Sequence, residues 1–537
     1  MRSSEASARQ RKASAAAVRD MLRDGQELAL LDLREELIFS QSHLLFARSV
    51  PLSRLELIVP RLVPRRSTRV VLCDAGEGLA ERGAAVLLRH GYSDVSVLDG
   101  GIAAWAAAGF ELFSGVNVPS KAFGEVVEHV SGTPSISAED LDALMRDGAD
   151  MVVLDSRPFD EFNRVSIPSG INTPGAELVL RVRDLAPSPQ TLIVVNCAGR
   201  TRSIIGAQSL INAGVPNRVV ALRNGTMGWT LAGLACAHGE TRRAPAPSPD
   251  GVAWARSAAA AVGRRLGIER IDDATLERFR AEREVRSLYL LDVRDPTEYA
   301  AGHIPGAVSA PGGQLVQGTD QYIGTLGARV VLVDDKEVRA LMTASWLRQM
   351  GWREVYVFAG TGGETGWPEA PMLGAPPPRE MLVSVADLAG MLARGEATVV
   401  DLSLSRSYLA GHIPGAWFAI RARLAQSLAK MPLKGTLVLT SEDGRLAGLA
   451  APEAAALTAQ PMRVLDGGNA AWMAAGQPLT KDDPRMADDP DDAWLKPYER
   501  TGDTQKAAAE YLSWEVDLLA RIARDGTTSF APLGPTR

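Results

Sequence analysis

The chain repeats one pattern of residues four times, and no other feature constrains its fold as strongly. Residues 14–32 can be laid over residues 137–155. In each stretch a serine suited to cap a helix is followed by leucine or methionine at helical spacing. A glycine and a short apolar strand ending on aspartate come next. The same helix–strand pattern recurs at 273–292 and 384–401, so the sequence predicts four related units in tandem.

Two later landmarks follow in the same order in every unit. A turn reads Gly-His-Ile-Pro-Gly-Ala at 302–307 and 411–416, and shorter versions of it lie at 166–170 and 43–51. Each unit then closes with an apolar strand, a glycine turn and a tryptophan, at Trp105, Trp229, Trp367 and Trp472. Because the tryptophan keeps one position in all units, we expect all four in the core. The alternation of helices and strands favours an α/β fold, each unit a mostly parallel sheet flanked by helices.

Changes in composition delimit these units. We expect them at residues 14–115, 133–240, 269–374 and 381–480. Residues 241–268 read as a linker with room for a helix, and 481–537 as an acidic segment followed by a helix.

The last helix should begin near Asp503 and end at Gly526. One face carries apolar side chains, namely Leu512, Val516, Leu519 and Ile522. The opposite face mixes both charges, which favours packing on the body of the protein over binding to a membrane.

Charge and cysteine content exclude several classes of protein. The chain has 58 Lys and Arg against 64 Asp and Glu, a net charge of −6, which argues against a generally basic nucleic-acid binder. No uncharged apolar run reaches the roughly 18 residues of a transmembrane helix, so we expect no membrane span. Three cysteines in 537 residues are too few for a disulfide framework. We therefore expect a cytoplasmic protein with reduced thiols.

The second unit contains the residues best suited to chemistry. Its strand at 192–195 runs into Asn-Cys-Ala-Gly-Arg-Thr-Arg at 196–202, and a helix follows up to Gly214. A cysteine between a strand end and a helix N-terminus lies among backbone N–H groups, near the positive end of the helix dipole. Two arginines add positive charge, so a thiolate should be favoured and an anion should bind beside it. This arrangement suits attack by the thiolate on an anionic sulfur donor.

The repeated unit resembles the rhodanese homology domain, the sulfurtransferase module. The resemblance rests on Asp-x-Arg, on Gly-His-Ile-Pro-Gly-Ala, on the strand–Cys–loop–helix order and on the closing Asp-Gly-Gly…Trp. In that family a six-residue loop beginning with the catalytic cysteine cradles a persulfide, and residues 197–202 match its length and its terminal arginine. The resemblance implies that Cys197 is the nucleophile that carries the sulfane sulfur. It also implies a set of donor-binding residues, namely Arg157, Ala198, Gly199, Arg200, Thr201 and Arg202.

The other three units depart from this loop pattern. The first keeps Cys73, a possible second site, but has Gly78 in place of the terminal arginine. It also carries Asp74 and Glu77, whose carboxylates should raise the thiol pKa and repel an anion. The third unit has Asp334 at the cysteine position and the fourth has Ser441, and neither side chain can form a persulfide. We therefore expect one working site in four units.

The expected activity is transfer of sulfane sulfur from thiosulfate, or from a related persulfide or polysulfide, to a thiol or cyanide. Because the sulfur travels on the protein itself, we expect no cofactor. We also expect no metal, since His303 and His412 lie in identical turns without ligands at suitable spacing.

Two alternatives remain open. A phosphatase of the same fold needs a loop one residue longer, and the residue six places after Cys197 is Ser203. A scaffold or sulfur-carrier adaptor would use the third and fourth units to dock a protein partner, such as a protein sulfur carrier.

Overall fold

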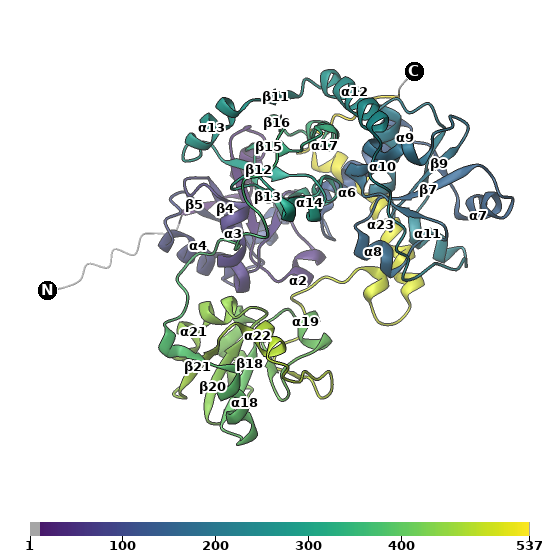
Figure 1. Cartoon of the computed structure of the whole chain (residues 1–537). Helices are drawn as coiled ribbons and strands as arrows, with labels where there is room; N and C mark the ends of the chain where they lie inside the picture. Colours follow the sequence, from purple (N-terminus) through teal and green to yellow (C-terminus); the bar gives the residue numbers. More distant parts are fainter. Residues whose placement is uncertain (1–10, 536–537) are drawn as a thin grey trace.

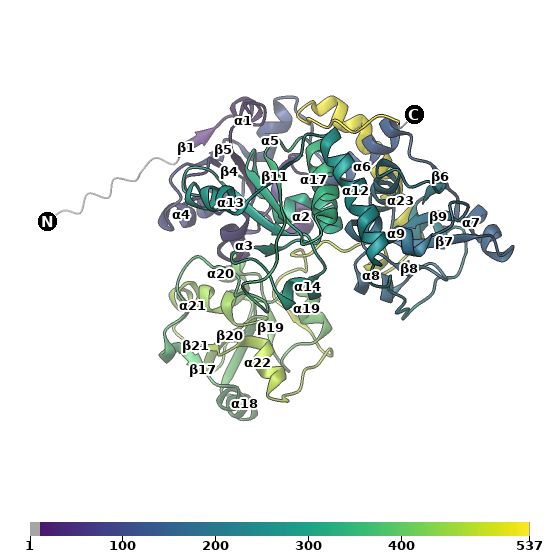
Figure 2. The same ribbon diagram turned by 45° about the horizontal axis from the view of Figure 1, so that its top comes forward.

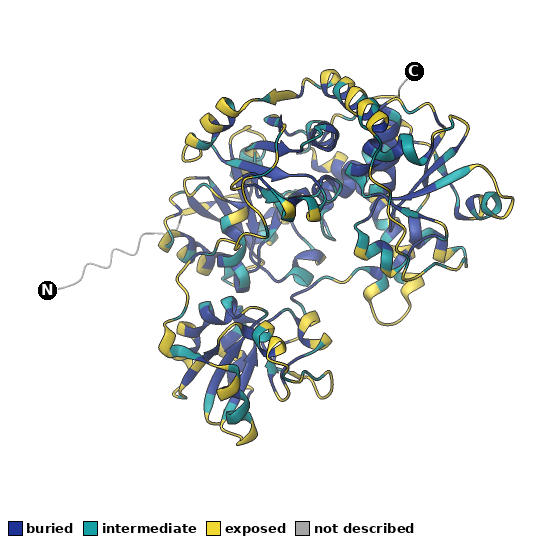
Figure 3. Cartoon of the chain, in the orientation of Figure 1, coloured by how far each residue is buried: buried dark blue, intermediate teal, exposed yellow. Residues whose placement is uncertain are grey.

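This computed structural model describes residues 11–535. It contains four small β-sheets, one in each expected unit. Every strand pairing inside a unit is parallel, and helices connect the strands (Figure 1). Parallel neighbours require crossover connections, which explains why helix and strand alternate in the sequence. The central strands are buried along most of their length (Figure 3). The predicted α/β fold with four tandem units is confirmed.

The first two units have the same order of elements. The first contains β1 (Arg11–Ala13), α1 (Ala15–Met21), β2 (Leu28–Asp32), α2 (Glu36–Gln41), β3 (Arg48–Ser49), α3 (Leu55–Leu62), β4 (Val70–Cys73), α4 (Leu79–Arg89), β5 (Val95–Leu98) and α5 (Gly101–Ala107). The second contains β6 (Ser135–Ile136), α7 (Ala138–Arg146), β7 (Met151–Asp155), α8 (Phe159–Arg164), β8 (Ile171–Asn172), α9 (Leu178–Leu185), β9 (Leu192–Asn196), α10 (Thr201–Asn212), β10 (Val219–Leu222) and α11 (Gly225–Leu231).

The last two units repeat this order with local changes. The third contains β11 (Glu269–Ile271), α13 (Asp273–Ala281), β12 (Leu288–Asp292), α14 (Pro296–Ala301), β13 (Val308–Ser309), α15 (Gly312–Gln317), α16 (Thr319–Tyr322), β14 (Thr325–Leu326), β15 (Arg329–Val333), α17 (Val338–Gln349) and β16 (Val355–Phe358). The fourth contains β17 (Leu382–Val383), α18 (Val385–Ala393), β18 (Ala397–Asp401), α19 (Ser405–Ala410), β19 (Trp417–Phe418), α20 (Leu424–Ala429), β20 (Thr436–Thr440), α21 (Arg445–Leu457), β21 (Met462–Leu465), α22 (Gly468–Ala474) and β22 (Arg485–Met486).

The first helix of each unit begins where its capping residue places it. The hydroxyls of Ser14, Ser137 and Ser384 each accept a hydrogen bond from the N–H three residues later, at 3.2, 3.0 and 3.2 Å. Asp272 does the same in the third unit, at 2.9 Å. These caps satisfy N–H groups that have no partner inside the helix.

Three of the four repeated tryptophans lie in the core, and the expectation for the other was wrong. Trp105, Trp229 and Trp472 are 1–2% exposed, whereas Trp367 is 63% exposed. The third unit has no helix after β16, because glycines and a proline follow that strand, and its closing segment runs as loop and turn. Trp367 lies against Tyr299 instead, with 5.1 Å between the ring centroids.

The elements between the units hold the first three together. α6 (Val118–Ser131) is buried along most of its length and packs against α10. Residues 241–268 include α12 (Pro249–Arg265), which packs between α9 and α17. β14 of the third unit extends the sheet of the first, antiparallel to β2. The fourth unit stands below the first in Figure 1 and remains at one side of the other three in Figure 2.

The C-terminal helix α23 (Thr504–Asp525) packs on the body of the protein against α6. It begins after Asp503 and ends at Gly526, as predicted. Leu512 and Ile522 are buried, but Val516 is 50% exposed, so its assignment to the packed face was wrong. The buried stripe runs instead through Leu518 and the acidic Glu515, whose burial an apolar pattern does not reveal. Among the described residues, no helix combines the length and apolarity needed to cross a membrane.

Candidate active site

Cys197 lies between the end of β9 and the first turn of α10, and it is 2% exposed. Its Sγ lies 3.5 Å from the hydroxyl of Ser203, which itself donates to the carbonyl of Arg200 at 2.8 Å. The thiol therefore points over the N-terminus of α10. This is the placement that the sequence predicts for a strand–Cys–loop–helix segment.

The backbone of the loop leaves a row of donors open. The N–H groups of residues 198–202 have no acceptor within the described part of the chain. They surround the start of α10, where the helix dipole is positive. Consecutive free N–H groups at a helix N-terminus form a ready site for an anion.

The closing turn of the unit holds this loop from the other side. The carbonyls of Cys197 and Ala198 accept hydrogen bonds from the N–H groups of Thr226 and Met227, at 2.8 and 3.0 Å. Gly225 has a φ of 54° and lies so close that an added Cβ would be 2.3 Å from the oxygen of Cys197. The repeated glycine turn is therefore a clamp on the loop, a role that its sequence alone does not show.

The two loop arginines are each paired with carboxylates. Arg200 is bound by Glu125 of α6 at 2.7 and 2.8 Å, and Arg202 by Glu161 of α8 at 2.8 and 3.2 Å. Burial alone would raise the pKa of Glu161, but Arg202 holds it well below its ordinary value. Both guanidinium groups are thus fixed in place and partly neutralised.

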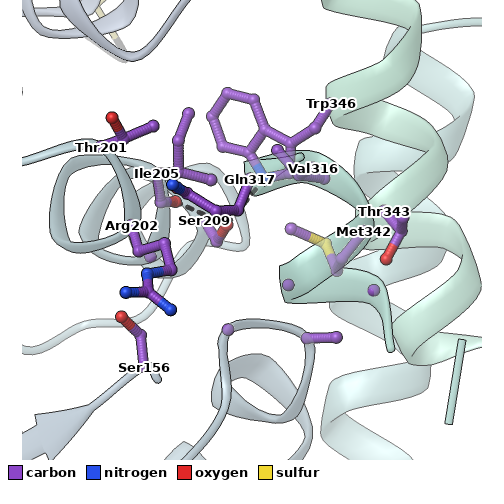
Figure 4. A pocket seen from close by; sticks show the side chains of 15 residues that line it. Ser156, Thr201, Arg202, Ile205, Ser209, Val316, Gln317, Met342, Thr343 and Trp346 are labelled. Carbon is purple, nitrogen blue, oxygen red and sulfur yellow. Dashed lines mark hydrogen bonds between the residues drawn. The ribbon is translucent and has the colours of Figure 1, made fainter. Parts of the chain in front are cut away.

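Arg202 also borders a cavity of about 30 Å³ between the second and third units. Figure 4 shows its guanidinium directed toward Ser156, with Trp346 of α17 on the opposite wall. The amide oxygen of Gln314 from the third unit accepts from Arg202 at 3.2 Å. The third unit therefore contributes to the position of a loop residue in the second.

Arg157 lies beside a cavity that neighbours the one over Cys197. It is 1% exposed and is held by Asp155 at 2.7 and 2.9 Å and by the carbonyl of Val165 at 2.7 Å. It lines a cavity of about 100 Å³ together with Ala198, and it does not line the cavity that contains Cys197.

The cavity over the loop measures about 70 Å³ and includes the whole segment 197–202. Its roof comes from the C-terminal segment, through Lys496, Tyr498, Tyr511 and Glu515. Lys121 of α6 also lines it and binds Glu515 at 3.1 Å. Sequence reasoning missed these residues because they lie 70 or more positions from Cys197 along the chain.

Glu515 comes closest to the loop. An added Cβ on Gly199 would be 3.2 Å from Glu515 Oε2, which is buried and has no hydrogen-bond partner. The one signal in the sequence is an acidic residue within the apolar face of the last helix. A glycine at position 199 is what leaves room for this carboxylate.

The corresponding loops of the other units are filled by their own side chains. In the first unit the carboxylate of Asp74 accepts from the N–H groups of Gly76 and Ala80, at 2.9 and 3.0 Å. Burial, with Asp32 and Asp74 adding to it, raises the pKa of the Cys73 thiol well above its ordinary value. This loop offers its donors to its own acid side chain rather than to an external anion.

The third and fourth loops are closed in a similar way. Asp334 binds Arg339 at 3.0 Å and accepts from its N–H at 2.8 Å. Ser441 accepts from the N–H of Ala447 at 3.3 Å. His303 and His412 stack on tyrosine rings in equivalent turns, as structural residues do. No cluster of three or more possible metal ligands occurs in residues 11–535.

Comparison with known proteins agrees with this geometry. A family model described as the rhodanese-like domain matches residues 14–108, 137–232, 274–367 and 384–475. The chain belongs to the rhodanese-like family. A thiosulfate sulfurtransferase from Pseudomonas aeruginosa is 49% identical, with a TM-score of 0.94, and the match covers 97% of this chain and 100% of that one. Family and relative together make the chain an enzyme of the sulfurtransferase class.

Shorter solved structures match single parts of the chain. A protein from Bacillus halodurans is 20% identical with a TM-score of 0.19, covering 20% of this chain and 78% of its own. A rhodanese-related protein from Thermoplasma volcanium is 17% identical with a TM-score of 0.17, covering 19% of this chain and 97% of its own. No curated protein matches the chain.

Proposed function

We propose that the second unit transfers sulfane sulfur from thiosulfate, or from a related persulfide or polysulfide, to a small acceptor through a persulfide on Cys197. One observation carries the proposal. The loop of the second unit presents a cysteine beside a row of N–H groups that no residue of the described chain occupies. In the other three units, side chains of the loop itself accept hydrogen bonds from nearby N–H groups.

The proposed reaction proceeds in two displacements. The Cys197 thiolate attacks the outer sulfur of thiosulfate, a new S–S bond forms, and the original S–S bond breaks with its electron pair leaving on sulfite. The acceptor thiolate or cyanide then attacks the terminal sulfur of the persulfide. That step gives a new persulfide or thiocyanate and restores the Cys197 thiolate.

The residues of the loop divide this work. The N–H groups of Ala198, Gly199 and Thr201 would hold the negative charge of the donor throughout, as backbone donors do for other developing anions. Arg200 and Arg202 would add positive potential from fixed positions. Arg157 would act indirectly, because it orients Asp155, which also accepts from Asn196 beside the cysteine at 2.8 Å.

The size of the cavity limits the acceptor. A volume of about 70 Å³ under the C-terminal segment suits cyanide, a small thiol or the tip of a cysteine side chain. A protein sulfur carrier would therefore need to present its thiol on a narrow, extended segment. All three cysteines are free, which suits a reducing compartment such as the cytoplasm.

Mass spectrometry after treatment with thiosulfate tests the proposal. We expect one additional sulfur atom, located on Cys197, and loss of sulfite release in Cys197→Ser. Cys73→Ser is the matched control, since it changes a buried cysteine at the same position of another unit, and it should react like the wild type. Turnover of Cys197→Ser at the parental rate would overturn the assignment.

A further inference from the structure

A further cavity, of about 420 Å³, lies at the seam between the first and third units. Its walls come from the end of α1, from β3, from α16, from the connection between α17 and β16, and from residues 526–530 after α23. None of its lining residues lines the cavity over Cys197. It is therefore a separate space, with its own polar groups.

Arg48 is the unusual residue of this cavity. Its side chain is 2% exposed, and it makes no hydrogen bond or ion pair within the described part of the chain. Burial lowers the pKa of its guanidinium, with only Asp320 and Tyr289 opposing this from a distance. The hydroxyl of Tyr289 is already engaged by the backbone of Leu62 and Thr325.

The other buried arginines among residues 11–535 are partnered differently. Each is in direct contact with at least one carboxylate, and the set consists of Arg34, Arg157, Arg294, Arg339 and Arg421. A buried guanidinium without such a partner is costly, because it has lost the water that solvated it. The exception at Arg48, which has no partner within residues 11–535, therefore points to a bound ligand.

A carboxylate, Asp320, also lines this cavity. It is not within ion-pair distance of Arg48, and its Oδ1 is buried without a hydrogen-bond partner. Burial raises the pKa of this carboxyl. Arg286, which also lines the cavity, is already paired with Glu27 and Glu354. Arg48 and Asp320 are thus a buried donor and a carboxylate with a buried acceptor atom that lack partners in the described chain on the wall of one cavity, whereas Arg353, also without an ion pair, is exposed.

We propose that this cavity binds a small oxyanion through the guanidinium of Arg48, with Asp320 accepting a hydrogen bond from a proton that the anion carries. Hydrogen phosphate and small hydroxycarboxylates meet both requirements. Sulfate, which is fully ionised, meets only the first. A planar guanidinium suits such anions because it can donate two parallel hydrogen bonds.

Calorimetric titration of the full-length protein with phosphate, sulfate and malate at constant ionic strength tests this proposal. The loop at Cys197 could take the same anions, so the titrations are made in an Arg202→Gln background as well as in the wild type. In the Arg202→Gln background we expect saturable binding of phosphate at one site per chain. Arg48→Met should weaken this binding by at least about tenfold, the loss of one charge-assisted contact.

Matched variants separate this site from general charge effects. Arg218→Gln removes the same charge from an exposed position and should leave phosphate binding unchanged. Arg48→Lys keeps the charge and should retain weaker binding. Asp320→Asn should reduce the preference for phosphate and malate over sulfate.

Two results would overturn the proposal. One is the absence of saturable binding in the wild type, which would mean that only water occupies the cavity. The other is equal binding in the wild type and Arg48→Met. Melting temperatures in chloride buffer show that the variant is folded, and Arg48→Met should be no less stable than the wild type there, since it removes a buried unpaired charge.

Discussion

At the scale of single residues, the arginine of the Asp-x-Arg motif binds the aspartate that ends the preceding strand. Arg34, Arg157 and Arg294 bind the aspartate two positions earlier with Nε–Oδ1 distances of 2.8, 2.9 and 2.9 Å. The geometry is the same beside Cys73, Cys197 and Asp334, so it does not depend on a cysteine at the loop. This motif fixes the end of a strand in three units, and in the second unit that strand lies next to the cysteine loop.

Glu35 supports a prediction about pH at the same scale. It is 5% exposed, and burial, together with nearby Asp492, raises its pKa to about 7 although Ser53 donates to it. Between the unfolded pKa of about 4.3 and this value, the folded chain keeps a proton that the unfolded chain loses. Stability should therefore fall by roughly 2–4 kcal/mol as pH rises through that window.

Urea unfolding of Glu35→Gln at pH 5 and pH 8 measures this effect. We expect the variant to gain stability relative to the wild type at pH 8 and to differ little at pH 5. Glu380→Gln, at an exposed position, is the control and should follow the wild type at both values. Parallel pH profiles for the wild type and Glu35→Gln would show that Glu35 does not titrate in this range.

At the scale of elements, much of the architecture could be predicted from local signals. Serine caps, strands ending on aspartate and the Cys–loop–helix order are encoded within a few neighbouring residues, and all appear in the structure. The burial of Trp367 was predicted wrongly because the third unit keeps the repeated tryptophan but lacks the helix that buries it in the other units. The roof over Cys197 could not be predicted. It depends on contacts such as that between Lys121 and Glu515, which are 394 positions apart in the sequence.

Gly225 connects the closing turn to the cysteine loop and yields a second prediction. An alanine there would place a methyl group 2.3 Å from the carbonyl of Cys197, at a φ that side chains rarely adopt. The loop must shift, and displacement of a reacting group by about 1 Å can cost on the order of 100-fold in rate. We expect Gly225→Ala to lose sulfur transfer by about that factor while remaining folded.

Steady-state assays compare this variant with Gly233→Ala. Gly233 has a similar φ of 76°, but no atom lies within 4 Å of its added Cβ. The control should therefore lose some stability and keep its activity within about twofold. A wild-type rate in Gly225→Ala would mean that the turn does not position the loop.

At the scale of the whole molecule, one unit depends on parts contributed by the others. α6, which links the first and second units, pairs Glu125 with Arg200 and holds Glu515 of the roof through Lys121. The third unit supplies Gln314 to Arg202. The third unit, whose own loop holds Asp334 in place of a cysteine, thus supports the loop of the second.

Glu515 yields a prediction at this scale, because it joins α23, α6 and the cysteine loop. Glu515→Gln removes a negative charge beside the cavity while keeping the shape of the side chain. Thiosulfate is a dianion, so we expect its KM to fall by about fivefold and kcat to change by less than about twofold.

Donor-dependent kinetics at low ionic strength provide the measurement. Glu510→Gln changes an exposed carboxylate of the same helix and should leave the KM unchanged. An unchanged or higher KM in Glu515→Gln would show that this carboxylate does not face the bound donor.

The helix α23 has a further consequence for how the molecule responds to its ligands. Its 22 residues form a rod about 33 Å long, which borders the cysteine cavity through Tyr511 and Glu515. The residues directly after it, 526–530, line the cavity that contains Arg48. A tilt of α23 would change the shape of both cavities at once. If a ligand of one cavity tilts α23 and so changes the affinity of the other cavity for its ligand, the second ligand must change the affinity for the first by the same factor.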